Sequence, residues 1–357
     1  MAAKNLAPIR QKLLHWYDRN KRDLPWRRTR DPYAIWLAET MLQQTQVKTV
    51  LPYYKKFLRA FPTVKALDRA PLEKVLRAWS GLGYYRRAEN LKKSARQIVR
   101  DHAGQLPQEF AALRRLPGVG DYTAGALMSI AFGRRYPAVD GNVRRVLGRV
   151  FAINAINNER QLQHTASQLV ARSRPGDFNQ ALMELGARLC APTAPKCAHC
   201  PLRAHCAANL HGDAEQQTTS RRESEFKSVV WPLAIVRQGG KILLRRRAHN
   251  GLLAKLWELP GGEMVESKKP LEFLREELRE LAPAVKRRNA IGEIRHGITH
   301  RRIRAPIYLF DCPARAKLRL PSKRWRWIDG RRIEAQAISS MTAKAVRLLN
   351  QHEKSFL

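Results

Sequence analysis

The chain has 357 residues, 44% of them apolar, which excludes a disordered protein and exceeds what a single hydrophobic core usually covers. Lys and Arg number 67 against 30 Asp and Glu, and the net charge of +37 indicates a polyanionic partner, because each neutralised phosphate releases counterions. A surface adapted to an unusual cell interior is the alternative. The Met-Ala-Ala-Lys start has no apolar segment behind it, and no apolar run approaches the ~20 residues that span a bilayer, so we expect a cytoplasmic protein without a membrane partner.

Along the chain, residues 8–210 are predicted to be mostly helical, because apolar residues recur at spacings of three and four. Asp31 and Pro32 predict the N-cap and first residue of a helix over 32–42. Residues 213–228 are polar and aperiodic, which predicts a linker. A smaller α+β domain is expected beyond it. Its elements are strands at 229–236 and 242–244 around Gly239-Gly240, a helix at about 270–281, strands near 291–299, 302–311 and 325–328, and a helix over 341–351.

Four of the five cysteines lie in one short segment, with the spacing Cys190-x6-Cys197-x2-Cys200-x5-Cys206. In a reducing compartment such a cluster predicts a metal site before it predicts disulfides. Four thiolates can hold an iron–sulfur cluster or a zinc ion, and His199 or His205 could join a zinc site. The spacing by itself leaves both metals open. Cys312, in a predicted strand, is expected to be an ordinary buried thiol.

A glycine-rich turn, Leu116-Pro117-Gly118-Val119-Gly120, separates two helical patterns. Two glycines that flank one residue allow a tight turn with bare amides. At a helix N-terminus these amides can bind a phosphate oxygen directly or through a cation. A plain helix–helix connection is the alternative.

Two carboxylates stand in contexts that fit glycoside chemistry. Glu39 lies on the first predicted helix, where Ile35, Trp36 and Leu42 are neighbours one turn away. An apolar face should raise its pKa and make it a proton donor, whereas a glutamate tilted to solvent is the alternative. Asp140 is predicted to be an N-cap, where helix amides keep a carboxylate ionised. A protonated Glu and an ionised Asp are the pair that cleavage through an oxocarbenium-like sugar needs.

Together these segments resemble the endonuclease III superfamily of helix-hairpin-helix DNA glycosylases, and within it the MutY family of adenine DNA glycosylases. The cysteine spacing and the glycine turn fit the superfamily. The Met-Leu-Gln-Gln-Thr-Gln block separates this family from its endonuclease III relatives. The family resemblance is carried by five blocks, Leu24–Arg27, Trp36–Val47, Gly81–Ala88, Val139–Val143 and Phe178–Gly186.

By this resemblance Glu39 protonates N7 of adenine and Asp140 stabilises the cationic sugar, with Tyr122 and Asn142 in support. The adenine pocket is implied to consist of Trp26, Arg27, Leu42, Gln180 and Glu184. DNA contacts are implied for Gln43, Gln44, Thr45, Tyr84, Gly118, Val119 and Gly120. Gln44 and Tyr84 would wedge into the duplex beside 8-oxoguanine once adenine has left the stack. For Trp26, Leu42 and Tyr84, taken without the surrounding blocks, ordinary core packing is the alternative.

The resemblance also implies a cofactor and a reaction type. It favours one [4Fe–4S] cluster on Cys190, Cys197, Cys200 and Cys206, and it allows a monovalent cation at the glycine turn. Bifunctional members of the superfamily place a lysine after this turn as a Schiff-base nucleophile. Tyr122 holds that place here, and a phenol cannot form an imine, so we expect base excision without strand cleavage.

The part after the linker resembles the Nudix-like domain of the same family, through Leu256–Gly262. A working Nudix hydrolase gathers several glutamates on one helix for Mg²⁺. Lys268 stands here at the place of one, and Arg279 and Glu280 at the place of a pair. We therefore expect no pyrophosphatase activity.

The segment Arg295–His300 aligns with the loop by which that family reads 8-oxoguanine. Thr299 and His300 keep a hydroxyl and an imidazole at the reading positions. Ile298 stands in place of the usual aromatic residue, so an aromatic ring is missing from this contact.

The sequence thus predicts a mostly α helix-hairpin-helix glycosylase fold over residues 1–212, with a six-helix region at about 29–136 and an iron–sulfur region from about 1–28 and 137–212. A Nudix-like α+β domain is expected over 229–357. The predicted function is base excision repair of adenine mispaired with 8-oxoguanine or guanine in double-stranded DNA, by a monomer. The alternatives are a bifunctional glycosylase for oxidised pyrimidines and a non-catalytic iron–sulfur DNA-binding protein.

Overall fold

The structure is a computed structural model that describes residues 6–154, 158–215, 226–249, 251–264, 268–298, 300–316 and 320–354. The chain forms two compact units. The first comprises Met1–Ala70 with Glu89–Arg222, and the second comprises Pro71–Ala88 with Glu223–Leu357. Among the described residues, no helix is long and apolar enough to cross a membrane.

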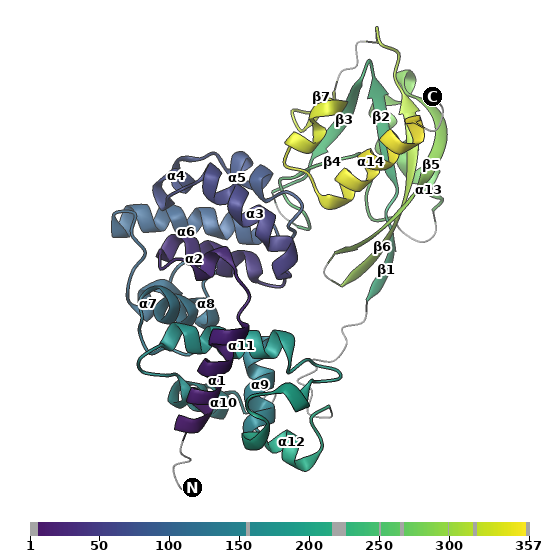
Figure 1. Cartoon of the computed structure of the whole chain (residues 1–357). Helices are drawn as coiled ribbons and strands as arrows, with labels where there is room; N and C mark the ends of the chain where they lie inside the picture. Colours follow the sequence, from purple (N-terminus) through teal and green to yellow (C-terminus); the bar gives the residue numbers. More distant parts are fainter. Residues whose placement is uncertain are drawn as a thin grey trace. The chain divides into compact units, whose positions relative to one another are not determined.

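The part of the chain before the linker is helical, as predicted (Figure 1). Its α-helices are α1 Ala7–Asn20, α2 Pro32–Leu42, α3 Val47–Ala60, α4 Val64–Arg69, α5 Leu72–Trp79, α6 Arg86–His102, α7 Phe110–Arg114, α8 Asp121–Ala126, α9 Gly141–Phe151, α10 Glu159–Leu169, α11 Pro175–Arg188 and α12 Ala207–His211. A 3-10 turn, η1 Pro25–Arg27, precedes α2, and a short π-helix, η2 Leu127–Ala131, continues α8.

Helix α2 begins and ends as the sequence predicts, and its cap explains why. The Asp31 carboxylate accepts hydrogen bonds from the backbone N–H groups of Tyr33 at 3.1 Å and Ala34 at 3.3 Å. Pro32 occupies the first helical position, where its missing N–H costs nothing. Nine consecutive residues from Tyr33 to Met41 are buried, so α2 runs through the interior of the unit. The helix can therefore hold a side chain away from water.

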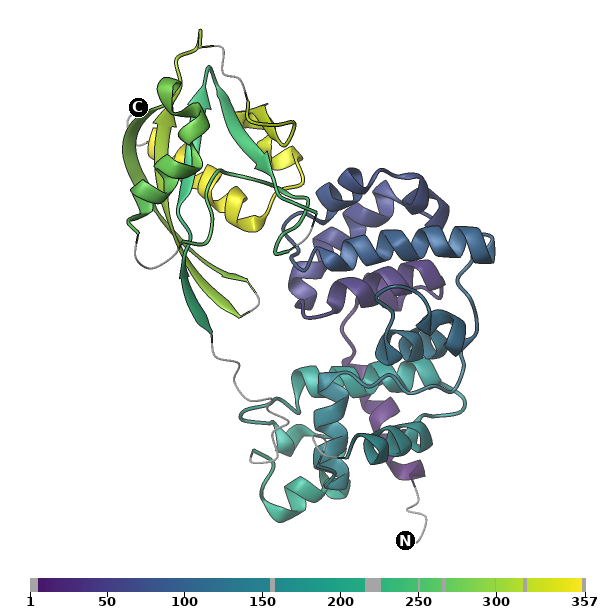
Figure 2. The same ribbon diagram turned by 180° about the vertical axis from the view of Figure 1, so that it is seen from behind.

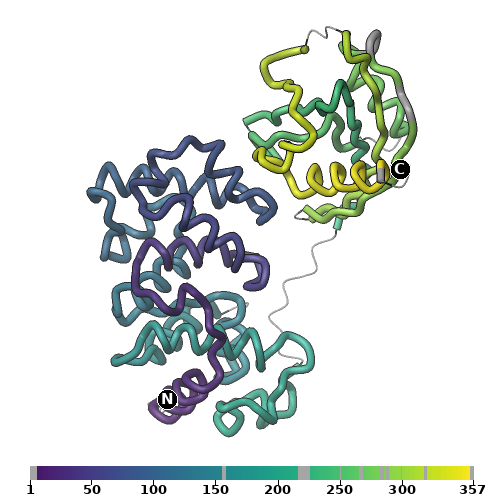
Figure 3. Tube along the Cα trace, turned by 45° about the horizontal axis from the view of Figure 1, so that its top comes forward, coloured from purple at the N-terminus to yellow at the C-terminus, as the bar shows by residue number. Residues whose placement is uncertain are grey.

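A hydrophobic cluster joins the two ends of the helical part. Helix α9 contributes Val143, Val146, Leu147 and Val150, whose spacing of three and four puts them on one face. They pack with residues of α1, α10 and α11, and Figure 3 shows the N-terminal helix beside the segment that contains α11. Three cysteines of the 190–206 segment lie against this cluster. The N-terminal and the cysteine-containing segments thus share one core.

The second unit contains a seven-stranded sheet in its described residues. The strands are β1 Lys227–Val230, β2 Leu233–Gln238, β3 Lys241–Arg246, β4 Trp257–Glu258, β5 Lys286–Ile298, β6 Arg301–Asp311 and β7 Trp325–Asp329. The path runs β1-β6-β2-β3-β4, while β5 pairs with β6 and β7 with β3. Strand β6 is parallel to β1 and β2, and the β2–β3, β3–β4, β3–β7 and β5–β6 pairs are antiparallel.

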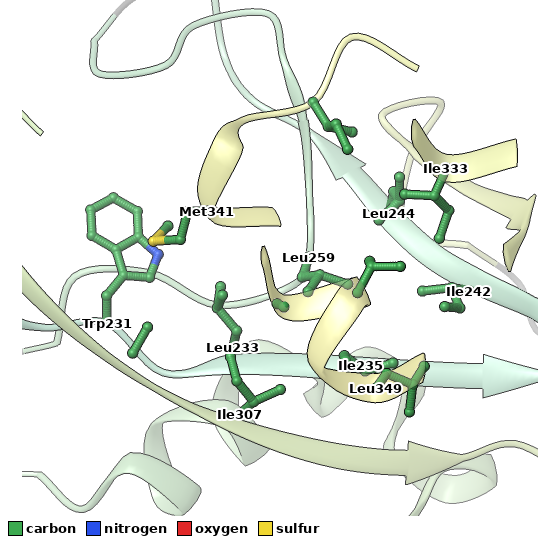
Figure 4. Packing of buried hydrophobic residues seen from close by; sticks show 14 of the residues in the cluster. Trp231, Leu233, Ile235, Ile242, Leu244, Leu259, Ile307, Ile333, Met341 and Leu349 are labelled. Carbon is green, nitrogen blue, oxygen red and sulfur yellow. The ribbon is translucent and has the colours of Figure 1, made fainter. Parts of the chain in front are cut away.

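Helices cover both faces of this sheet. Leu233 and Ile235 of β2 pack on one side with residues of α14 Ser340–Lys354, while Ala234 and Val236 pack on the other with residues of α13 Pro270–Glu277. Figures 1 and 2, seen from opposite sides, bring α14 and α13 forward in turn. Figure 4 shows the packing of the α14 side. The alternation along β2 follows from the two-residue repeat of a strand.

Several predicted boundaries are corrected. The strand expected over 229–236 is interrupted at Trp231 and Pro232, because proline has no N–H to donate to a ladder. Strand β1 begins at Lys227, inside the predicted linker. The helix expected to reach residue 281 ends at Glu277 and is followed by the 3-10 helix Arg279–Ala284. Cys312 is buried as expected but follows β6 rather than lying in it.

Candidate active site

Glu39 lies on the buried part of α2 and is only 5% exposed, so of the two alternatives the structure shows the buried glutamate and not the solvent-facing one. Its Oε2 accepts a hydrogen bond from the Tyr122 hydroxyl at 2.6 Å. Burial is the main cause that raises the pKa of Glu39 to about 7, and the charge of Asp140 raises it further. The hydrogen bond from Tyr122 and the charge of Arg27 act in the opposite direction. Glu39 can therefore hold a proton near neutral pH.

Tyr122 comes from α8, directly after the glycine turn. Its hydroxyl donates to Glu39, and the Met183 Sδ lies 3.5 Å from it. Burial and the two nearby carboxylates raise the pKa of Tyr122 well above its usual value. The phenol therefore stays protonated near neutral pH and can donate a hydrogen bond there.

Asp140 caps α9, as predicted. Its Oδ1 accepts from the Val143 N–H at 2.7 Å, and its Oδ2 accepts from the Asn142 side-chain amide at 3.1 Å. Burial raises the pKa of Asp140, and these hydrogen bonds oppose the rise. The amides therefore act in the predicted direction, although burial outweighs them.

Two of the predicted adenine-pocket residues, Arg27 and Glu184, form an ion cluster with Arg22. Glu184 is 0% exposed, and its two oxygens accept from the guanidinium groups of Arg22 and Arg27 at 2.7–2.8 Å. Burial alone would raise the pKa of Glu184, but the two arginines outweigh it and lower the pKa to about 2. Sequence reasoning missed Arg22, whose contact with Glu184 spans 162 residues. In this structure the two arginines occupy the carboxylate oxygens of Glu184, a residue that the resemblance places in the adenine pocket.

The other predicted pocket residues lie close to α2 and α11. Trp26 is buried, and its ring meets that of Tyr54 edge to face with centroids 5.2 Å apart. Leu42 is half-buried at the end of α2, and Gln180 is 9% exposed on α11. Core packing alone would account for Trp26.

Arg145 links Asn142 to the cysteine segment and was also missed. Its Nη2 donates to the Asn142 Oδ1 and to the Gly186 carbonyl, both at 2.8 Å, and its Nε donates to the Cys190 carbonyl at 2.7 Å. Asn142 in turn donates to Asp140. A continuous chain of hydrogen bonds therefore runs from the backbone of the cysteine segment to a predicted catalytic carboxylate. The three-residue spacing of Asn142 and Arg145 on one helix is the signal that could have revealed it.

The four clustered cysteines are half-buried free thiols that line one cavity. Arg149, 1% exposed, donates from Nη1 to the Cys190 Sγ at 3.3 Å and to the Ala191 carbonyl at 2.6 Å. Within the described ranges, no three His, Cys, Asp or Glu side chains are already gathered as a metal-binding group. The donor set and the shared cavity nevertheless fit a thiolate-bound metal centre.

The predicted DNA-contact residues at the end of α2 form a turn. The Gln43 side-chain amide donates to the Thr123 Oγ1 at 3.3 Å, and the Thr45 hydroxyl donates to the Gln43 carbonyl at 3.3 Å. Gln44 is exposed and has a left-handed φ of 55°. Such a conformation is uncommon for a residue with a side chain, and residues that adopt it are frequent at functional sites.

Tyr84 is another strained and exposed residue. It has a φ of 47° and is 46% exposed, so core packing, the alternative to a role in DNA contact, does not describe it. The buried Arg87 guanidinium lies 5.3 Å from the centroid of the Tyr84 ring and 5.4 Å from that of Trp79. Arg87 also donates to the Gly83 carbonyl at 3.2 Å. The ring is thus in contact with a buried guanidinium and is still partly exposed to solvent.

The glycine turn joins α7 to α8 as predicted. Gly118 has a φ of 80°, which favours glycine, and Gly120 caps α8. The Val119 side chain is buried, and its carbonyl accepts from Arg114 at 2.9 Å. The turn therefore brings Tyr122 into the site and presents backbone amides at a helix start.

In the second unit, His300 is exposed in the turn between β5 and β6, and its carbonyl accepts from the Lys227 N–H at 2.8 Å. Thr299 lies outside the described residues. A neighbouring cavity of about 950 Å³ is lined by cationic side chains that include Arg295, Arg302 and Lys344. The turn predicted to read a base thus adjoins a basic groove.

Comparison with known proteins agrees with these features. Residues 37–172 match the HhH-GPD superfamily of base excision DNA repair proteins, and residues 232–348 match the NUDIX domain. The chain is 36% identical to the adenine DNA glycosylase of Homo sapiens, over 95% of this chain and 73% of that protein. It is 36% identical to the adenine DNA glycosylase of Rattus norvegicus, over 98% and 79%. A solved thermostable thymine-DNA glycosylase is 34% identical with a TM-score of 0.55, over 58% of this chain and 98% of that one.

Proposed function

The chain belongs to the adenine DNA glycosylases, base excision repair enzymes of the helix-hairpin-helix superfamily, and from that premise we propose that it excises adenine opposite 8-oxoguanine by acid catalysis at Glu39. Its partner is DNA. The observation that carries the mechanistic proposal is the buried Glu39 carboxyl, bonded to Tyr122 and near Asp140, with a pKa raised to about 7. A carboxyl that keeps its proton at neutral pH is the group that this reaction needs.

In the proposed step, the Glu39 proton passes to N7 of an adenine that has been flipped out of the duplex. The bond between C1′ and N9 then breaks, and its electron pair leaves with the neutral purine. The sugar develops oxocarbenium character, which the ionised Asp140 stabilises across a short distance. Water adds to C1′ and releases a proton, which the now ionised Glu39 can accept, and an abasic sugar with a C1′ hydroxyl remains. Asn142 supports Asp140 by donating to its carboxylate.

Recognition of adenine is assigned to the pocket next to Glu39. Arg27 can donate to a ring nitrogen, and Trp26, Leu42 and Gln180 are proposed to surround the base. In this structure the Glu184 carboxylate accepts hydrogen bonds from Arg22 and Arg27, which supports a role in orienting the Arg27 guanidinium. Direct contact between Glu184 and the adenine amine remains a prediction that requires one of these arginine donors to move.

The second unit is proposed to read the base opposite adenine through Thr299 and His300. The exposure of His300 supports this, and the cationic groove beside it suits the phosphate backbone of DNA. A guanine and an 8-oxoguanine differ by a carbonyl at C8 and a hydrogen on N7. A hydroxyl and an imidazole can distinguish these edges by hydrogen bonding.

One [4Fe–4S] cluster is proposed on Cys190, Cys197, Cys200 and Cys206. When bound, the cluster supplies a covalent link among four points of this segment and fixes its shape. The guanidinium groups of Arg145 and Arg149, which donate to backbone carbonyls of this segment, then act on a rigid segment. A monovalent cation at the glycine turn, bound by backbone carbonyl oxygens, is proposed as a bridge to a DNA phosphate.

The test is adenine release from A·8-oxoG, A·G and A·T duplexes, each with and without alkali. We expect release from the first two and strand breakage only after alkali, because Tyr122 has no amine to form an imine. Glu39→Gln should abolish release while duplex affinity stays close to that of the wild type. Strand breakage without alkali and covalent trapping by borohydride would support a bifunctional enzyme. Binding of mismatched DNA without release would support a non-catalytic protein.

A further inference from the structure

An extended segment delivers Asp140 to the site. Residues 133–140 form neither helix nor strand and connect the π-helix η2 to the start of α9. Backbone groups in such a segment need hydrogen-bond partners outside regular structure when they are buried. Ala138, two residues before Asp140, is 0% exposed. What holds this segment therefore decides where the Asp140 carboxylate lies.

The side chain of Asn179 on α11 holds the segment on both sides of Pro137. Asn179 is 1% exposed. Its Nδ2 donates to the Tyr136 carbonyl at 2.8 Å, and its Oδ1 accepts from the Ala138 N–H at 3.3 Å. Pro137 has no N–H of its own. A single amide group thus satisfies the backbone of the residues before and after it.

The orientation of this amide is fixed by Ser129 of the π-helix. The Asn179 Nδ2 makes a second hydrogen bond, to the Ser129 Oγ at 2.8 Å, and the Ser129 hydroxyl donates to the Gly125 carbonyl at 2.8 Å. Because the hydroxyl has one hydrogen and uses it on Gly125, it accepts from Asn179. The amide nitrogen must therefore face Ser129, and the amide oxygen must face Ala138.

Gly125 completes the contact from the opposite side. A Cβ at Gly125 would lie 2.0 Å from the Pro137 carbonyl oxygen, so only glycine permits this approach. The segment is consequently clamped between α8 and α11, close to the start of α9. A displacement at Ala138 would be passed along the extended backbone to Asp140.

We propose that Asn179 is a positioning residue that aligns the Asp140 carboxylate with the cationic sugar. The inference rests on the proposed function, in which Asp140 stabilises that cation. Misplacement of a reacting group by about 1 Å can cost roughly a hundredfold in rate. Loss of the Asn179 hydrogen bonds to Tyr136 and Ala138 should therefore slow excision. It should weaken the affinity for a duplex with a cationic sugar more than the affinity for a duplex with a neutral one.

The experiment uses the full-length protein and two abasic duplexes opposite 8-oxoguanine, one with a neutral tetrahydrofuran and one with a cationic pyrrolidine at the sugar position. The wild type should bind the cationic sugar more tightly, and Asp140→Asn should remove this preference. Asn179→Leu should lower the preference about tenfold or more, with the affinity for tetrahydrofuran changed less than about twofold. The single-turnover excision rate should fall by about ten- to a hundredfold.

Two further variants separate positioning from a general loss of packing. Tyr33→Phe is the matched control, because it removes a buried hydrogen bond to the Phe61 carbonyl far from Asp140, and it should keep the cation preference. If Asn179→Leu fails to fold, Ser129→Ala serves instead, because it removes the hydroxyl that orients the Asn179 amide and keeps the amide itself. It should lower the preference for the cationic sugar by a smaller factor. The inference is overturned if either variant loses the same affinity for the neutral and the cationic sugar. It is also overturned if excision is slow while the preference for the cationic sugar is unchanged. Absence of any preference in the wild type instead refutes the role of Asp140.

Discussion

Replacement of Glu39 by glutamine should stabilise the protein at neutral pH while it abolishes excision. The pKa of Glu39 rises from 4.5 to about 7 on folding, mainly through burial. Between these values the folded state binds more protons than the unfolded state, so the free energy of unfolding falls as pH rises through this window. The pKa difference corresponds to about 3 kcal/mol. Glutamine cannot ionise, so the variant keeps the free energy of unfolding that the wild type loses above pH 4.5. A gain in stability together with a loss of activity is expected when a proposed catalytic acid is replaced.

The assay is urea unfolding of Glu39→Gln and wild type at several pH values from 4.5 to 8. The difference in unfolding free energy should be small near pH 4.5, grow up to pH 7, and level off at about 3 kcal/mol in favour of the variant. Glu109→Gln, at an exposed position of the same unit, provides the control. A difference that does not depend on pH would show that Glu39 is ionised in the folded protein, and the proposed general acid would have to be abandoned.

Four further outcomes are expected. Tyr122→Phe removes a hydrogen bond that lowers the pKa of the catalytic acid, so the alkaline limb of the single-turnover rate should move up by about one pH unit; no movement would contradict the role of this bond. Glu184→Gln leaves two arginines uncompensated and should move the same limb down. The purified protein should contain about four irons and absorb as an iron–thiolate centre, and Cys200→Ala should lose both; a single zinc would refute the cluster. The double variant Thr299→Ala, His300→Ala should lower the preference for A·8-oxoG over A·G roughly tenfold, and an unchanged preference would place base reading elsewhere.

The elements that could be predicted from the sequence are those whose causes are local. The start of helix α2 was predicted correctly because two adjacent residues, Asp31 as the N-cap and Pro32 as the first helical residue, determine it. The β2–β3 hairpin followed from its paired glycines, which both adopt positive φ. The two-residue strand Trp257–Glu258 was not predicted, because its pairing with β3 depends on a contact made elsewhere in the chain.

The same distinction holds for the site. The apolar neighbours of Glu39 lie on its own helix, so burial was one of two alternatives that the sequence offered, and the resemblance to the family favoured it. The role of Arg22 was not predicted, because its partner Glu184 is far away in sequence. In a chain with 67 Lys and Arg, no local signal separates an arginine paired with a buried carboxylate from a solvated one. Asn179 stood in a block that was recognised, but its bonds to Tyr136 and Ser129 follow from folding alone.

The proposed general acid must keep its proton within a protein of net charge +37, and cations near that acid oppose this requirement. Arg27 lies close enough to Glu39 to lower its pKa. Its guanidinium is bound, together with that of Arg22, by the fully buried Glu184, whose pKa of about 2 keeps it negatively charged at neutral pH. The negative charge of Glu184 offsets these cations, so burial and the charge of Asp140 prevail at Glu39, and both raise its pKa. The ion cluster can thus present the donors of Arg27 to a base and still leave the neighbouring acid protonated.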